Sequence, residues 1–291
     1  MEEIKNQYLS LKASCRGAEM QSLTNLSTGR ECLWQGDPQF WGKRSPLLFP
    51  ITGRMWNNRT EFNGCEYSIP KHGFMQDRSF NLAEHTDTSL RYVFSSTPEE
   101  LKMFPFDFNL EIVYTLDGNK VRVDFHVENC SIDTMPFQIG GHPGLNLLDY
   151  KANDNVHGYL SFEGAPWRLL RAGEQGCTEP DPLEMPMLEE NLLPLKDGLF
   201  AHDALIFDKH QIKAITLHDK YRQPAVRLWS DAPAMLIWQP DKHGASFVCF
   251  EPWFGLCDTQ HFFGPFTQRP YVNKALPGKT WHGGYTIECL K

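Results

Sequence analysis

The sequence predicts an all-β protein, organised as a large antiparallel β-sandwich. Short runs rich in β-branched and aromatic residues recur along the chain, with turn residues between them. No segment shows the 3.6-residue period of a long amphipathic helix. The chain has 291 residues, and a sandwich of roughly 200 to 250 residues or more often forms one unit. We therefore expect residues 1–291 to form a single domain.

The clearest strand signal lies between Asn109 and Asn129. Apolar and polar residues alternate there in two runs, the second of which extends from Val121 to Val127. A period of two is typical of strands with one buried and one exposed face. Asp117-Gly118 lies between the runs and suits a turn that needs a positive φ. The segment is predicted to be a β-hairpin.

The other predicted elements are shorter. Pro98 to Leu101 favours one short helical turn, and Gly173 to Pro194 is rich in Pro, Gly and Glu and predicts a long surface loop. Strand patterns look alike on both sides of this loop, which favours one continuous sandwich over two domains. Eight further runs are expected to be strands: Tyr8 to Ser14, Glu31 to Gln35, Arg91 to Ser95, Ala214 to His218, Ala225 to Ser230, Ala234 to Trp238, Ser246 to Phe250 and Tyr285 to Leu290.

Composition excludes several classes of partner. The formal net charge is −8, whereas nucleic acids and anionic membranes require a basic surface. We therefore expect neither a nucleic-acid nor a membrane partner, and a small molecule or another protein is favoured. Hydrophobic residues make up 41% of the chain and aromatic residues 13%, which predicts a large packed core. The sequence leaves the oligomeric state open.

The eight cysteines are irregularly spaced and never form a Cys-x-x-Cys pair. This spacing argues against a disulfide framework and against a zinc site of that type. The segment that begins at Met1 has no basic region followed by an apolar one, and no run of about eighteen apolar residues occurs. These features predict a reduced, cytoplasmic protein.

Several familiar catalytic and binding motifs are missing or incomplete. Pro277 to Thr280 imitates the end of a phosphate-binding loop, but Asn273 stands where the required upstream glycine would be. The sequence contains no Gly-x-Gly-x-x-Gly after a strand, no His-Glu-x-x-His and no Gly-x-Ser-x-Gly. No spacing of residues suggests a metal site.

Four segments instead place titratable side chains among glycines, prolines and aromatic rings. They are Phe49 to Arg54, Pro70 to Phe74, Ile139 to Gly144 and Phe250 to Gly255. Each is expected to hold its charged or titratable group at a strand end, where a rigid sheet can direct it into a cleft. Glu251 is the strongest candidate, because a carboxylate among bulky apolar neighbours is partly desolvated and usually has a partner.

Ordinary structural roles compete with these functional ones. Arg54 is also typical of a surface charge whose stem lies along apolar groups, and His72 and His142 are also typical of solvated turn residues. Trp238 and Trp253 are core residues by default, although an aromatic ring beside polar groups is also how proteins bind the apolar face of a sugar.

Six motifs, taken together and in their order along the chain, resemble those of the aldose 1-epimerase (galactose mutarotase-like) superfamily, and most closely those of its LacX-like branch. The resemblance extends from about Tyr8 to Leu290. The motifs are Gly29 to Pro38, Leu48 to Arg54, Pro70 to Phe74, Gly140 to Asn146, Asp203 to Phe207 and Phe250 to Asp258. The resemblance implies a galactose-mutarotase type of β-sandwich with no metal and no organic cofactor.

The resemblance also implies roles for individual residues. It places the catalytic base on Glu251 and the catalytic acid on His142, with His72 and Arg54 holding the ring oxygen and hydroxyls of a sugar and Asp203 binding a hydroxyl. Relatives in this branch often carry an arginine at a position where this chain has Gln76. That departure weakens any inference that a sugar phosphate is held there.

The implied reaction agrees with the chemistry of these side chains. Exchange of α and β anomers requires removal of the hemiacetal proton and protonation of the ring oxygen, for which one base and one acid suffice. The sequence favours a cofactor-independent isomerase acting on a neutral hexose. Arg54 and Arg78 leave open a hexose 6-phosphate, and a non-catalytic carbohydrate-binding protein is the other alternative. Glycoside hydrolysis usually needs two carboxylates, and only Glu251 has a persuasive setting.

Overall fold

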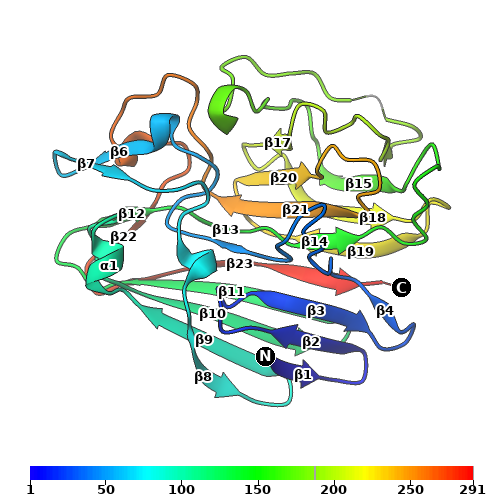
Figure 1. The fold of residues 1–291 in the computed structure, drawn as a ribbon, viewed down its shortest axis with the longest axis horizontal. Coiled ribbons are helices and arrows are strands. Elements are labelled where there is room, and N and C mark those ends of the chain that lie inside the picture. Colours follow the sequence, from blue (N-terminus) through cyan, green and yellow to red (C-terminus); the bar gives the residue numbers. More distant parts are fainter. Residues whose placement is uncertain (187, 291) are drawn as a thin grey trace.

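The structure of the chain is a computed structural model that describes residues 1–186 and 188–290. Strands arranged in antiparallel sheets dominate it, and the described part contains one α-helix, α1 (Pro98–Leu101). The predicted all-β antiparallel sandwich is therefore confirmed, as Figure 1 shows. Thr97 caps α1 and Glu100 completes a capping box, so the predicted helical turn is also present.

The largest sheet has nine strands; in Figure 1, β8–β11 and β23 form its lower part, and β15, β18 and β19 lie at the right. All of its neighbouring strands are antiparallel. In spatial order the strands are β16 (Leu193–Pro194), β15 (Tyr159–Gly164), β18 (Ile212–His218), β19 (Pro224–Trp229), β23 (Thr280–Cys289), β11 (Lys120–Asn129), β10 (Phe108–Asp117), β9 (Ser89–Ser95) and β8 (Asn81–His85).

A six-stranded sheet lies above β23 and β8–β11 in the same view. Its central strand, β21 (Phe247–Phe254), pairs with β20 on one side and with both β13 and β14 on the other. The remaining bounds are β17 (Leu205–Phe207), β20 (Ala234–Trp238), β13 (Ile139–Gly141), β5 (Leu47–Leu48) and β14 (Gly144–Asn146).

Smaller elements complete the fold. A four-stranded sheet consists of β1 (Glu2–Lys5), β2 (Leu9–Ala13), β3 (Met20–Asn25) and β4 (Arg30–Glu31). Two-stranded sheets are formed by β6 (Arg59–Phe62) with β7 (Cys65–Ser68) and by β12 (Met135–Phe137) with β22 (Asn273–Ala275). Short 3₁₀ turns are η1 (Trp56–Asn58), η2 (Met75–Asp77), η3 (Glu174–Gly176) and η4 (Phe266–Gln268).

The predicted hairpin is β10 followed by β11. Its register runs from Phe108 opposite Asn129 to Asp117 opposite Lys120, so that Gly118 and Asn119 form the turn. Gly118 has a φ of 57°, which is the left-handed conformation that the Asp-Gly signal predicted. In the described part of the predicted loop from Gly173 to Pro194, only η3, isolated bridges and β16 interrupt irregular backbone.

Most predicted strands have somewhat different bounds, among them β23, which begins five residues before the predicted start at Tyr285. The placement of Glu251 at a strand end was wrong. The run at Glu31 ends β4 and continues only as an isolated bridge at Leu33. β21 extends four residues beyond the predicted end at Phe250, so Glu251 lies inside a strand rather than at its end. All eight residues of β21 are buried, and a strand buried on both faces has no polar alternation to mark where it stops.

The hydrophobic core lies between the sheets. Its main cluster combines residues from the four-, nine- and six-stranded sheets, among them Leu11, Phe125 and Phe250. On β11 every second residue enters this core, and the intervening side chains form the open face of the nine-stranded sheet. All eight cysteines are free, and no described helix is long and apolar enough to cross a membrane.

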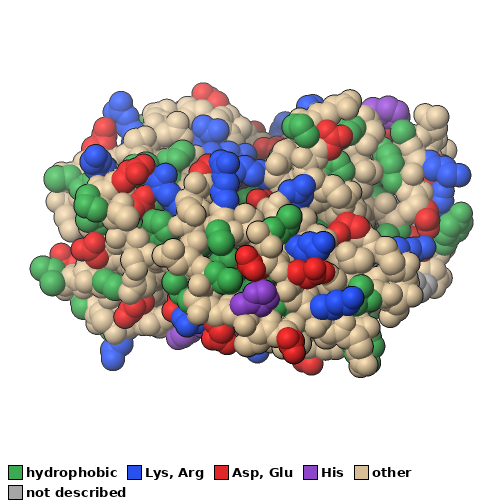
Figure 2. All heavy atoms as spheres, turned by 60° about the horizontal axis from the view of Figure 1, so that its bottom comes forward, with side chains coloured by type: hydrophobic (Ala, Val, Ile, Leu, Met, Phe, Trp, Pro, Cys, Tyr) green, Lys and Arg blue, Asp and Glu red, His purple; other side chains and the backbone are tan. Residues whose placement is uncertain are grey.

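On the face drawn in Figure 2, charged side chains of both signs are mixed. Figure 2 shows Lys and Arg interspersed with Asp and Glu over most of one face, while hydrophobic side chains are scattered singly or in small groups. The net charge of −8 is therefore not concentrated on this face.

Candidate active site

A cavity of about 300 Å³ brings together four of the predicted site residues. Glu251, His142, His72 and Asp203 all line it. These residues come from β21, from the turn after β13, from the segment before η2 and from the loop before β17. A volume of this size lies at the lower end of the range for small-molecule sites.

The alternation of β21 directs Glu251 into this cavity. Val248 and Phe250 belong to the main core on one face of the strand, so Glu251 and Trp253 emerge on the other face. Glu251 is only 2% exposed. A carboxyl group at such a position loses most of its hydration and needs a polar partner.

His142 supplies that partner. Its Nε2 lies 3.2 Å from Oε1 of Glu251. The imidazole stacks on the indole of Trp41, with ring centroids 4.8 Å apart and an interplanar angle of 28°, and Trp238 meets it edge-on at 5.8 Å. Aromatic packing on two sides fixes the orientation of the imidazole toward the carboxyl group.

Burial shifts both members of this pair toward their neutral forms. It raises the pKa of Glu251 well above the usual value, although the nearby charge of Lys71 opposes the shift. Burial, reinforced by Lys71, lowers the pKa of His142 to about 3. One proton shared between the two groups is therefore the resting state that these surroundings favour.

His72 faces the same cavity from a tight turn. Its φ is 65° and that of Gly73 is 74°. A Cβ at Gly73 would lie 1.9 Å from the carbonyl oxygen of Phe49, so only glycine fits there. The His72 ring is perpendicular to that of His142, with centroids 5.7 Å apart. Burial lowers the pKa of His72 well below 6.5, and the charge of Lys71 adds to this effect.

Asp203 and Arg54 occupy different positions relative to the cavity. Asp203 is exposed, lines the cavity from the loop before β17, and raises the pKa of Glu251 through its negative charge. Arg54 is not among the lining residues; its Nη1 lies 3.4 Å from Oδ1 of Asn58. Its charge still contributes to lowering the pKa of His72.

A buried ion pair holds the backbone next to Arg54. Nε of Arg269 lies 2.9 Å from Oδ1 of Asp258, and neither side chain is more than 2% exposed. The amide of Asp258 donates to the carbonyl of Arg54 at 3.0 Å, and Oδ2 of Asp258 accepts from the amide of Trp56 at 2.8 Å. This pair therefore anchors the segment that precedes η1 to the end of β21.

The geometry fits proton-transfer chemistry on a small polar molecule. A buried carboxyl and an imidazole in contact provide one acceptor and one donor, and the indoles of Trp41 and Trp238 provide apolar walls. Within the residues that the structure describes, no group of three or more His, Cys, Asp or Glu side chains is placed to hold a metal ion.

Comparison with known proteins assigns the chain to a family. The family model described as aldose 1-epimerase matches residues 2–287. The chain belongs to the aldose 1-epimerase family. The resemblance seen in the sequence motifs, including that to the LacX-like branch, is confirmed.

Two curated relatives of this family member come from Lactococcus lactis subsp. lactis: the chromosomal and the plasmid LacX proteins. Each is 30% identical over 301 residues, with 99% of both chains covered. A galactose mutarotase related enzyme from Lactobacillus acidophilus is 29% identical with a TM-score of 0.92, over 100% of this chain and 97% of the other. A galactose mutarotase-like protein from Lactobacillus casei is 28% identical with a TM-score of 0.91, over 99% of each chain.

Several residues of the epimerase-family cavity were not predicted as site residues. Lys71 stands beside His72 in a motif that the sequence did single out, and it is close enough to both histidines and to Glu251 to shift their pKa values. Trp41 and Lys43 come from a loop without any recognisable pattern. Trp253 lines the cavity although its sequence context predicted a core residue.

Proposed function

We propose that this chain is a cofactor-independent aldose 1-epimerase that interconverts the α and β anomers of a hexose. The observation that carries the proposal is the 3.2 Å contact between Glu251 and His142 at the wall of a 300 Å³ cavity. A base and an acid held side by side are what anomer exchange needs. Membership of the aldose 1-epimerase family supports the same reaction class.

The proposed reaction begins with the pair in its charged form. Transfer of the shared proton from Glu251 to His142 gives a carboxylate and an imidazolium without changing the number of protons. The carboxylate then takes the proton of the anomeric hydroxyl while Nε2 of His142 protonates the ring oxygen. The bond from the anomeric carbon to the ring oxygen breaks and an aldehyde forms. After rotation about the adjacent carbon–carbon bond, reclosure returns both protons.

Other residues are proposed to position the sugar. Nδ1 of His72 accepts a hydrogen bond from the amide of Gly53 at 3.1 Å, which leaves Nε2 to donate to a sugar oxygen. Asp203, which also lines the cavity, is proposed to accept hydrogen bonds from sugar hydroxyl groups. Arg54 is kept as a positioning residue that acts through its charge on His72, since it does not line the cavity itself.

A neutral hexose is the proposed substrate class. Arg78 forms ion pairs with Glu100 at 2.6 Å and Glu99 at 3.0 Å, so its guanidinium is already occupied. Lys43 lines the cavity but pairs with Asp77 at 3.1 Å. These cations are therefore poorly placed to hold a phosphate group.

A hexose 6-phosphate is the second candidate, and Lys71 is the observation that favours it. Lys71 lines the cavity and is exposed, and no hydrogen bond or ion pair of its ammonium group is found among residues 1–186 and 188–290. A free cation at the mouth of a site attracts anionic groups. A panel of neutral aldoses and hexose 6-phosphates, assayed for anomer exchange by NMR, decides between the two; a clear preference for the phosphates in kcat/KM would overturn the neutral hexose.

The same assay separates an enzyme from a sugar-binding relative without activity. Freshly dissolved α-glucose or α-galactose should approach anomeric equilibrium faster with the protein than without it, and Glu251→Gln should remove this effect. If the protein binds a sugar but leaves the rate of anomeric equilibration unchanged for every sugar in the panel, the chain is a non-catalytic carbohydrate-binding protein and not an epimerase.

A further inference from the structure

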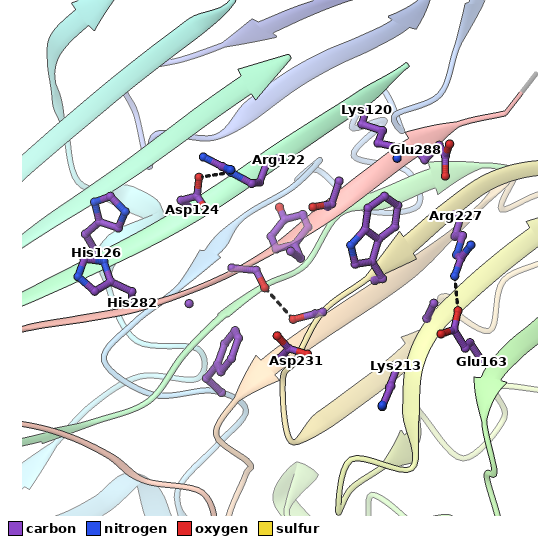
Figure 3. A pocket seen from close by; sticks show the side chains of 18 residues that line it. Lys120, Arg122, Asp124, His126, Glu163, Lys213, Arg227, Asp231, His282 and Glu288 are labelled. Atoms are coloured by element: carbon purple, nitrogen blue, oxygen red, sulfur yellow. Dashed lines mark hydrogen bonds and ion pairs between the residues drawn. The ribbon is translucent and has the colours of Figure 1, made fainter. Parts of the chain in front are cut away.

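A second and larger cavity lies on the open face of the nine-stranded sheet. It measures about 640 Å³, against about 300 Å³ for the candidate active site, and the two share no lining residue. Its floor is formed by β11, β23, β19 and β18, and Figure 3 shows its charged side chains projecting from these strands. The proposed acid and base chemistry makes no use of this groove.

The indole of Trp229 stands in the groove. Trp229 is half-buried at the end of β19, opposite Thr286 of β23. Lys120 Nζ lies 5.3 Å and Arg227 Cζ 5.6 Å from the centroid of the indole. Lys120 and Arg227 are both paired in register with Glu288, which lies two residues beyond Thr286, the partner of Trp229, on β23. Figure 3 shows Lys120 next to Glu288, with Arg227 projecting from the neighbouring strand β19.

Next to Thr286, on the same face of the sheet, β23 has a position without a side chain. Gly284 precedes Thr286 by two residues, lies on the same face of β23 and is paired with Asp124. A Cβ at Gly284 would lie 2.2 Å from the carbonyl oxygen of Val123, so this position admits only glycine. Ser230 Oγ donates to the carbonyl of Gly284 at 2.7 Å, which fixes the strand end beside it. The result is an open floor next to an aromatic ring.

The charges that surround this floor are balanced. Four basic and four acidic side chains line the groove, and Arg122 pairs with Asp124 at 2.6 Å while Arg227 pairs with Glu163. A groove with balanced charge offers no net attraction to a polyanion. The side chains of Lys213, Asp231 and Thr286 have no hydrogen-bond partner within the part of the chain that the structure describes. They are donors and acceptors free for a ligand.

We propose that this groove is a second, non-catalytic binding site for a neutral oligosaccharide. One sugar ring would lie with its apolar face against the Trp229 indole and over Gly284, because sugars present an apolar face and a polar rim that match such a ring. Asp231, Lys213 and Thr286 would hydrogen-bond its hydroxyl groups. The volume exceeds that of the active-site cavity, which suits a chain of sugar units rather than one.

The indole N–H signals in an NMR spectrum provide the test. Maltotriose, cellotriose, lactose and chitotriose are titrated into the full chain to millimolar concentration, and the Trp229 signal is assigned by its loss in Trp229→Phe. At least one of these saccharides should shift the Trp229 signal. Trp229→Ala should weaken its binding roughly tenfold or more, since aromatic anchors dominate such contacts. Asp231→Asn should weaken binding by a smaller factor.

Trp167→Ala is the matched control. Trp167 is 61% exposed and also has an arginine over its ring, with Arg168 Cζ at 5.0 Å, but it lies outside the groove. This variant should bind like the wild type, and Trp229→Ala should keep the wild-type rate of anomer exchange. If Trp229→Ala does not fold, Thr286→Val removes a hydroxyl with little change in shape and should still weaken binding.

Three results would overturn the proposal. The first is the absence of any shift at Trp229 with all four saccharides. The second is tighter binding of heparin or polyphosphate than of the neutral saccharides at this face. The third is a lower oligomer mass for Trp229→Ala in light scattering, which would make the groove an interface between copies of the chain. None of these results bears on the epimerase assay, so the two proposals fail separately.

Discussion

The backbone amide of Gly53 donates a hydrogen bond to Nδ1 of His72 at 3.1 Å. This contact decides which ring nitrogen of a neutral His72 carries the proton, namely Nε2. Because burial also lowers the pKa of His72 well below 6.5, the neutral ring with Nε2–H is the form present at neutral pH. His72 is therefore suited to donate one hydrogen bond to a sugar rather than to exchange protons with it.

Replacement of Glu251 by Gln should abolish most of the anomer exchange. Glutamine keeps the shape of the side chain but cannot accept the hemiacetal proton, so kcat should fall by roughly 10² or more. Polarimetry gives kcat, and calorimetry should show that sugar binding persists. His142→Asn should act likewise, while Glu111→Gln on the open sheet face serves as the control. Near-normal turnover of Glu251→Gln would make Asp203 the next candidate base.

Replacement of Arg54 by Ala should raise KM more than it lowers kcat. The charge of Arg54 acts on His72 in the ground state as well as in the transition state. Its removal should therefore weaken the binding of the sugar in both states to a similar extent. Initial rates over a range of sugar concentrations separate the two constants. Arg59→Ala is the control, because Arg59 is exposed and pairs with Glu66 on the β6–β7 hairpin. A large loss of kcat at unchanged KM would assign Arg54 to the chemical step instead.

The histidines of the site should make the fold sensitive to acid. The pKa of His142 is about 3 in the folded protein and about 6.5 in an unfolded chain. Between these values the unfolded state binds more protons at this position, so His142 makes the free energy of unfolding fall as the pH decreases from about 6.5 toward 3. His72 contributes in the same direction. The raised pKa of Glu251 contributes with the opposite sign, because the folded state binds its proton more tightly than the unfolded chain does.

Denaturant titrations at several pH values test this dependence. His142→Gln lacks one of the two titrating rings, so its free energy of unfolding should vary less steeply with pH between 6.5 and 3 than that of the wild type. His85→Gln, an exposed histidine, should keep the wild-type slope. Equal slopes for the wild type and His142→Gln would mean that His142 is already protonated in the folded state.

Removal of one member of the buried Arg269–Asp258 pair should be strongly destabilising. Arg269→Met leaves the carboxyl of Asp258 buried without its partner, and loss of one member of such a pair typically costs about 3–5 kcal/mol. Thermal or denaturant unfolding measures the loss. Arg59→Met breaks an exposed pair instead and should cost under about 1 kcal/mol. If Arg269→Met lowers the free energy of unfolding no more than Arg59→Met does, the Arg269–Asp258 pair does not hold the segment near Arg54.

The sequence predicts the sheet architecture better than it predicts the cavity. The β10–β11 hairpin has one buried and one exposed face, so alternation marks it along its whole length. The three-residue strands β13 and β14 are too short and too buried for such a pattern. Glu251 is identifiable because a carboxylate among aromatic residues is unusual, whereas Lys71 and Trp41 enter the cavity from loops whose paths depend on the rest of the fold.

The position of β23 has a consequence for how the chain folds. This strand, residues Thr280–Cys289, lies between β11 and β19 and pairs with both. Until β23 is in place, the nine-stranded sheet is divided into two parts, one of β8, β9, β10 and β11 and the other of β16, β15, β18 and β19, and the edges of β11 and β19 are unpaired. Closure requires contacts between residues more than 150 positions apart, such as Val121 with Ile287. The two parts of the sheet can therefore join only after β23 has been synthesised. This makes folding slow, and it leaves the unpaired edges of the incomplete sheet prone to aggregation.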